Sequence, residues 1–179
     1  LLEDPQISLT RMAECAGVTR PTLVHYFGDR NGAARAALES AALVGRRFLG
    51  LIVSLPIHDP QQVLEQVLLL TIVGWRDRGV GRLHEVGIQL GLNDAETAHC
   101  YLSEILDPLT ESMQHLLDRM VVAGSIAHPD THTAAVQLLG PVVLALLHQH
   151  GLGGRSVSPL SEEDLAREHV RAFMRAYAT

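Results

Sequence analysis

Several side chains near the start of the chain can bind phosphate groups and the edges of bases. Ser8 and Thr19 stand where two short helices are predicted to begin. At a helix start, a hydroxyl, the free backbone N–H groups and the helix dipole all favour a phosphate. Arg20 follows directly, and a guanidinium can form a bidentate pair with O6 and N7 of guanine. Together these residues predict a segment that contacts a DNA duplex.

Four further residues in the same stretch extend this prediction. Pro21 and Thr22 can contact the methyl groups of thymine, which is how apolar atoms read that base. His25 and Tyr26 are expected to point toward the DNA backbone. For His25 and Tyr26 the alternative is an ordinary place on the surface or in the packing of this segment.

Two short helices joined by a tight turn are needed to position these side chains. Ser8 caps the first helix and Gly17 ends it. Thr19 caps the second, with Pro21 in the first turn, where a missing N–H is harmless. The small Ala13 lies where the helices are expected to cross. The apolar residues predicted to face inward are Met12, Ala16, Val18 and Leu23. This is the pattern of a helix-turn-helix, whose second helix enters the major groove; the alternative is an ordinary αα-corner with a glycine turn.

The amino-acid sequence of this segment resembles that of the DNA-binding head of the TetR (tetracycline-repressor) family. The matching residues are Met12-Ala13, Ala16-Gly17-Val18, Thr19, Thr22-Leu23, His25-Tyr26-Phe27 and Arg30. The resemblance is strong over residues 8–53 and architectural beyond them. It implies a regulator that binds double-stranded DNA as a pair of heads on a palindromic site, because one head offers few contacts.

Three departures from the family pattern stand out. Val24 replaces a tyrosine whose hydroxyl usually contacts the DNA backbone. Arg30 replaces the usual lysine, which keeps the positive charge for a phosphate. The family's first helix, which precedes the motif, is absent from this sequence or present only as its tail, so the head is expected to be truncated.

The rest of the chain predicts an all-α fold, because no long stretch alternates apolar and polar residues. Asp29 is expected to cap a long linking helix over about residues 30–53. Asp59, Asp130 and Ser161 stand at the starts of later helices, and the helix after Asp59 is apolar nearly all round. We therefore predict a DNA-binding domain over residues 1–53 and an effector-binding and dimerisation domain over residues 54–179.

The resemblance implies a homodimer through the last two helices, at about 130–150 and 161–177. The composition of these helices agrees, because they carry more large apolar residues than are needed to cover the core of one small domain. The alternative is that these residues pack within the chain.

The middle helices of the family enclose a small-molecule effector. The candidates for lining such a site here are Leu68, Thr71, Ile72, Trp75, Tyr101, Met113, Leu116, Leu117, Leu139 and Val143. An apolar wall with a few polar points suits a hydrophobic or aromatic molecule. Its binding is expected to shift the heads to a spacing that no longer fits DNA, so the effector releases a repressor from its operator. For each residue the alternative is plain core packing.

Charge and cysteine content fit this interpretation. Residues 1–53 carry six arginines against five acidic residues, whereas residues 54–179 carry eight against fifteen, and the chain has no lysine. A polyanion would therefore approach the N-terminal part. With only two cysteines, we expect no disulfide framework. The sequence contains no charge-free run of 18 or more apolar residues, so we expect no membrane span. We expect a cytoplasmic protein with no membrane contact.

Other function classes find less support in the sequence. The close histidine pairs His128 with His132 and His148 with His150 have poor spacing for a metal site, so neither metal nor cofactor is expected. No phosphate-binding loop or serine nucleophile motif occurs. The chain is therefore not expected to be an enzyme. An all-helical enzyme, or a family member that has lost DNA binding, stays open as an alternative.

Overall fold

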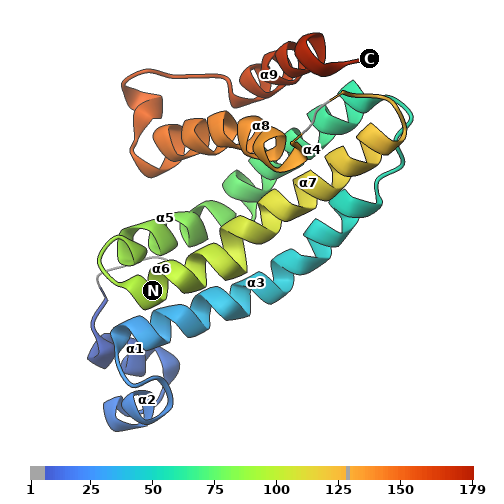
Figure 1. Cartoon of the computed structure of the whole chain (residues 1–179). Helices are drawn as coiled ribbons and strands as arrows, with labels where there is room; N and C mark the ends of the chain where they lie inside the picture. Colours follow the sequence, from blue (N-terminus) through green and yellow to red (C-terminus); the bar gives the residue numbers. More distant parts are fainter. Residues whose placement is uncertain (1–6, 128–129) are drawn as a thin grey trace. The chain divides into compact units, whose positions relative to one another are not determined.

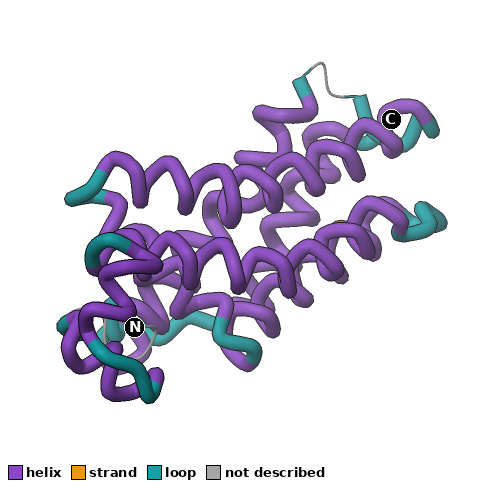
Figure 2. Tube along the Cα trace, turned by 90° about the horizontal axis from the view of Figure 1, so that it is seen from below, coloured by secondary structure: helices purple, strands orange, loops and turns teal. Residues whose placement is uncertain are grey.

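The computed structural model describes residues 7–127 and 130–179, except for the Val44 side chain. Nearly all of this part of the chain is helical, with short connecting loops (Figure 2). Within the described ranges the extended backbone pairing is a single isolated bridge between Ile126 and Ala178. The predicted all-α class is confirmed.

The helices begin and end close to the positions that the sequence predicts (Figure 1). The first group is α1 (Leu9–Ala16), α2 (Arg20–Phe27), α3 (Arg30–Ser54), α4 (Pro60–Asp77), α5 (Val80–Gly91) and α6 (Ala95–Tyr101). The second group is the π-helical turn η1 (Leu102–Leu106), α7 (Asp107–Val122), α8 (Thr131–Leu146), the π-helical turn η2 (Leu147–Gly151), the short 3₁₀ turn η3 (Gly154–Ser156) and α9 (Glu162–Tyr177).

Side-chain caps fix most of these starts. Ser8 and Thr19 accept the backbone N–H of the residue three positions on, and so do Asp59, Asp130 and Ser161. Each cap satisfies an N–H group that a helix start would otherwise leave without a partner. The predicted caps are therefore confirmed at these five positions, and also at Asp29, whose Oδ1 accepts the N–H of Gly32 at 2.7 Å near the start of α3.

The chain forms two compact units, each built from two stretches of sequence. The head unit consists of Leu1–Arg46 and Arg82–Asp107, and the body unit of Arg47–Gly81 and Pro108–Thr179. This packing divides the chain differently from the predicted functional boundary between residues 53 and 54, because part of α5, α6 and η1 pack with the first half of α3. The functional boundary stays a prediction.

The head unit has two small apolar clusters. The first is made of Ala34, Val86 and Leu90, and the second is built around Leu38, Cys100 and Tyr101. Gly87 makes the second possible, since a Cβ there would lie 2.2 Å from Cδ2 of Tyr101. The Tyr101 hydroxyl and Nδ1 of His84 share a hydrogen bond of 2.7 Å, and both side chains are buried.

The prediction that four apolar residues of α1, α2 and their turn face inward was wrong for two of them. Ala13 and Leu23 are buried, and Met12 is half-buried, but Ala16 and Val18 are exposed. The physical reason is length: two helices of eight residues share one narrow contact face, which Ala13 and Leu23 fill.

The body unit has one large apolar core, in which α4 packs against α8 and α9 while α8 packs against α9. In Figure 1, α8 and α9 run in opposite directions. Seven side chains of α4 are buried, in keeping with a sequence that is apolar nearly all round this helix: Val63, Leu64, Val67, Leu68, Thr71, Ile72 and Trp75.

The helix from α6 to α7 passes through a wider turn just before Pro108. Because proline has no N–H and its ring clashes with the carbonyl four residues earlier, a regular helix cannot continue unchanged. Here the N–H of Asp107 bonds to the carbonyl of Leu102, five residues back, in the π-helical turn η1. A proline at this position in the sequence indicates a kink or the start of a new helix, and the wider turn is consistent with that.

Candidate nucleic-acid interface and effector site

The recognition segment is held by a compact turn between α1 and α2. Gly17 adopts a left-handed conformation with φ of 66°, which favours glycine. The N–H of Val18 then bonds to the carbonyl of Ala13 at 3.0 Å. Thr19 accepts the N–H of Thr22 at 3.3 Å and thereby fixes the first turn of α2. This geometry is that of a helix-turn-helix.

The predicted DNA-binding residues other than Arg30 lie on the outside of this segment. Thr22 is half-buried and the remaining six are exposed: Ser8, Thr19, Arg20, Pro21, His25 and Tyr26. The hydroxyls of Thr19 and Thr22 lie 2.8 Å apart. The Tyr26 side chain is 74% exposed and meets the His25 ring edge to face, with centroids 5.3 Å apart. Six of the seven belong to α2 or its cap, and Ser8 caps α1.

Arg30 has a different environment. Its Nε donates to the backbone carbonyl of Ile7 at 3.1 Å, and its Nη2 is buried. The guanidinium therefore ties the residue before the α1 cap to the start of α3. A phosphate contact by Arg30, which the family resemblance implies, would be left to Nη1.

Arg20 is the arginine of the head unit that stays available. Among the described residues it makes no hydrogen bond or ion pair, whereas the other arginines of this unit are engaged. The engaged pairs are Arg11 with Glu14, Arg30 with Ile7, Arg35 with Asp94 and Glu96, Arg46 with Glu104, and Arg82 with Glu85. A base contact by Arg20 would therefore break no interaction among these residues.

The predicted effector residues fall into both units. Nine of the ten are on α4, α7 and α8 of the body unit, where eight are buried and Val143 is half-buried. The hydroxyl of Thr71 donates to the carbonyl of Val67 at 2.9 Å, so this polar group is already satisfied. Tyr101 belongs to the head unit, where it pairs with His84. The structure thus places the nine together as closely packed core and assigns Tyr101 to another cluster.

The described residues hold no group of three or more histidine, cysteine, aspartate or glutamate side chains arranged for a metal ion. His128, one member of a histidine pair in the sequence, lies outside the described residues. In His132, the other histidine of that close pair, Nδ1 lies 3.3 Å from Oε1 of Gln114.

A sequence profile for the C-terminal domain of AefR-like transcriptional repressors, one of the TetR C-terminal domain profiles, matches residues 62–179. This match covers more than half of the chain. The chain belongs to the TetR family of transcriptional regulators. The resemblance noted in residues 8–53 is therefore joined by a match over residues 62–179 of this TetR-family chain. None of the curated proteins matches it in sequence.

Solved structures share the fold of this TetR-family chain along nearly its whole length. A TetR-family regulator from Mesorhizobium loti has a TM-score of 0.78 at 18% identity and covers 97% of this chain and 87% of its own. The SmeT–triclosan complex has a TM-score of 0.72 at 18% identity, with coverages of 97% and 83%; SmeT is the repressor of a Stenotrophomonas maltophilia multidrug efflux pump. The flavonoid-responsive regulator FrrA has a TM-score of 0.69 at 19% identity, with coverages of 99% and 90%.

The polar contacts that hold the head unit together could not be found from the sequence. Arg35 reaches Asp94 and Glu96, and His84 reaches Tyr101, each across many residues. None of these residues belongs to the helix-turn-helix motif. The glycine at position 87 was a signal of close packing, since no other residue fits against the Tyr101 ring.

Proposed function

We propose that this TetR-family chain is a homodimeric repressor that binds a palindromic operator and leaves it when a small hydrophobic effector binds. The observation that carries the DNA part is the surface of α2: Arg20 is exposed at its first residue, with no partner among the described residues. A guanidinium in this position can pair with guanine without first leaving another contact.

In this proposal Ser8 and Thr19 contact phosphates, Pro21 and Thr22 contact thymine methyls, and His25 and Tyr26 lie along the DNA backbone. The two caps support the phosphate contacts, because the first N–H groups of α1 and α2 are directed toward these exposed side chains. Arg30 contributes mainly by holding the start of α1, through its bond to Ile7.

The proposed dimer forms through α8 and α9. The buried side of α8 faces its own core, yet Val136 and Leu144 on the same helix are 50% and 67% exposed. By length and apolar composition alone, the stretch Thr131–Gly151 could cross a membrane. Core helices of globular proteins pass the same test. An apolar surface on a second side of α8 supports burial against a second copy of the chain.

The proposed effector binds within the body unit, among the packed side chains of α4, α7 and α8. Because this cluster is closely packed, an effector must displace side chains to enter, and the flexible Met113 is suited to such repacking. SmeT was solved with triclosan and FrrA is flavonoid-responsive, so two proteins of similar fold support an aromatic, largely apolar effector. We propose no catalytic role and a location in the cytoplasm, where a repressor meets its operator.

Selection of bound sequences from random DNA with the full-length protein tests this function. The expected product is a palindrome whose half-sites lie about one helical turn apart. Triclosan is then added to a mobility-shift assay with the selected DNA. Release of the DNA would identify triclosan as an effector, whereas an unchanged complex would mean that another aromatic molecule is the effector. Failure to enrich any sequence would contradict the DNA-binding function.

A further inference from the structure

The exposed side of α8 is centred on a glycine that the packing of its own chain does not require. Gly140 lies in the middle of this helix, and among the described residues a Cβ there would meet no neighbouring segment within 4 Å. Glycine weakens a helix interior relative to alanine, and it is used where a second backbone approaches closely. Since no other segment of this chain makes that approach, a second molecule is the candidate.

The large apolar side chains on this side of α8 are placed symmetrically about Gly140. Val136 and Leu144 are 50% and 67% exposed, and each stands four positions from the glycine, so all three lie on the same side of the helix. When two copies of α8 cross at Gly140 in opposite directions, Val136 of one copy faces Leu144 of the partner subunit, and the same contact occurs twice. The exposed apolar side of α8 is therefore complementary to itself.

The exposed side of α9 has the same symmetry in its charges. From the start of the helix to its end, this side carries Asp164, Glu168, Arg171 and Arg175. Antiparallel pairing about the midpoint of this series places Asp164 opposite Arg175 of the partner subunit. The Asp164 side chain is 75% exposed, and its one ion pair among the described residues is with Arg167 at 3.3 Å. Its carboxylate can therefore accept a second guanidinium.

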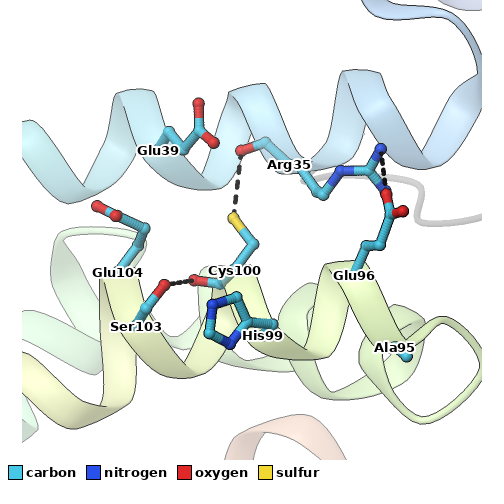
Figure 3. Close-up of a pocket in the computed structure, with 8 residues that line it drawn as sticks. All are labelled: Arg35, Glu39, Ala95, Glu96, His99, Cys100, Ser103 and Glu104. Carbon is cyan, nitrogen blue, oxygen red and sulfur yellow. Dashed lines mark hydrogen bonds and ion pairs between the residues drawn. The ribbon is translucent and has the colours of Figure 1, made fainter.

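Arg175 makes no hydrogen bond or ion pair with any residue that the structure describes. In the head unit, by comparison, arginines find carboxylates on a neighbouring helix of the same chain. Figure 3 shows Arg35 of α3 reaching Glu96 of α6, at 3.1 Å. Because opposite charges on two surfaces orient their association, the charges of α9 favour a second copy in the antiparallel direction.

A hydrogen bond places the two centres of symmetry at the same level of the α8–α9 pair. Nε2 of His169 donates to the carbonyl of Gln137 at 2.9 Å. His169 stands beside the midpoint of the α9 charges, and Gln137 lies within one turn of Gly140. Since α8 and α9 pack together and run in opposite directions (Figure 1), one twofold axis can pass beside both centres.

We propose that two copies of the chain pair about a twofold axis that passes beside Gly140 of α8 and the midpoint of the α9 charges. The two α8 helices touch at their glycines, and Val136 packs on Leu144 of the partner subunit. Asp164 pairs with Arg175 of the partner subunit. This inference rests on the proposed homodimer and goes beyond it, because it names the residue on the axis and the contacts that set the register.

Cysteine crosslinking of the full-length chain under mild oxidation tests the position of the axis. In a Cys15→Ser background, which removes the exposed thiol, Gly140→Cys should give a disulfide-linked dimer, because only a residue beside the axis meets its own copy. The two copies of residue 136 lie roughly 12 Å apart along the helices, too far for a disulfide. Val136→Cys and Leu144→Cys should therefore stay uncrosslinked alone and crosslink when the two variants are mixed.

Sedimentation equilibrium of the same proteins separates this inference from the proposed homodimer. A chain that sediments as a dimer without crosslinking at Gly140→Cys would overturn the position of the axis and leave the homodimer in place. A monomeric wild-type chain would contradict both. Because a Cβ at position 140 meets no other described segment, Gly140→Cys should not disturb the fold of the single chain.

A charge exchange tests the pairs on α9. Asp164→Arg should weaken the dimer about tenfold or more, because it places like charges opposite each other twice, and adding Arg175→Asp should restore the affinity. Glu111→Arg makes the same charge change at an exposed position of α7 and should leave the dimer unchanged. Equal affinity of Asp164→Arg and wild type, or no recovery in the double variant, would overturn the antiparallel pairing of α9.

Discussion

Acidification should destabilise the head unit through one buried histidine. Burial lowers the pKa of His84 from 6.5 to about 4, so its ring is neutral in the folded protein at pH 7. The unfolded chain binds a proton more readily than the folded chain between these two values. Stability from this group is therefore complete above about pH 7 and is lost as the pH falls through 6.5 toward 4.

The expected loss can be calculated from the two values. At pH 5 His84 would be protonated in nearly all unfolded molecules and in few folded ones, which corresponds to about 2 kcal/mol of unfolding free energy. The contact at risk is the 2.7 Å hydrogen bond between Nδ1 of His84 and the hydroxyl of Tyr101.

Urea unfolding followed by circular dichroism at pH 7 and pH 5 measures this loss. In the His84→Gln variant, the difference in unfolding free energy between pH 7 and pH 5 should be smaller by about 2 kcal/mol. The reason is that glutamine can still form a hydrogen bond with Tyr101 but does not titrate. His115→Gln removes an exposed histidine of the body unit instead and serves as the matched control. A pH dependence that is equal in wild type and His84→Gln would refute the reasoning.

Three substitutions test other parts of the structure. Gly87→Ala places a Cβ 2.2 Å from Cδ2 of Tyr101 and should cost about 1–3 kcal/mol or more; an unchanged unfolding temperature would contradict this packing. Arg20→Ala should weaken binding to a selected operator by about 1–3 kcal/mol per head at an unchanged unfolding temperature, whereas unchanged affinity and base preference would remove Arg20 from the interface. Leu144→Glu should shift the chain from dimer to monomer in sedimentation equilibrium because it charges an exposed apolar site on α8; a stable dimer would place the interface elsewhere.

Local signals in the sequence predicted the helices well. A helix cap depends on residues three positions apart, so Ser8, Thr19 and Asp130 could be recognised without knowing the fold. Gly17 was equally clear, because a left-handed residue between two short helices favours glycine. These signals were enough for the helix-turn-helix.

Contacts between residues far apart in the chain could not be predicted from the sequence. Arg30 carries a charge suited to phosphate, and only the path of the chain before α1 shows that its Nε bonds to Ile7. In the same way, the apolar residues nearly all round α4 indicated a largely buried helix, but apolar content cannot distinguish a filled core from a ligand site. The packing of Leu38 with Cys100 and Tyr101 depends on α3 meeting α6, which no sequence motif predicts.

The most direct measurement is a binding titration of the selected operator with altered spacing between its half-sites. If two copies of α2 read the two halves together, inserting about half a helical turn, roughly five base pairs, should weaken binding by about 100-fold or more. Restoring a full turn should recover part of the affinity. Equal affinity for all spacings would contradict recognition by a paired head.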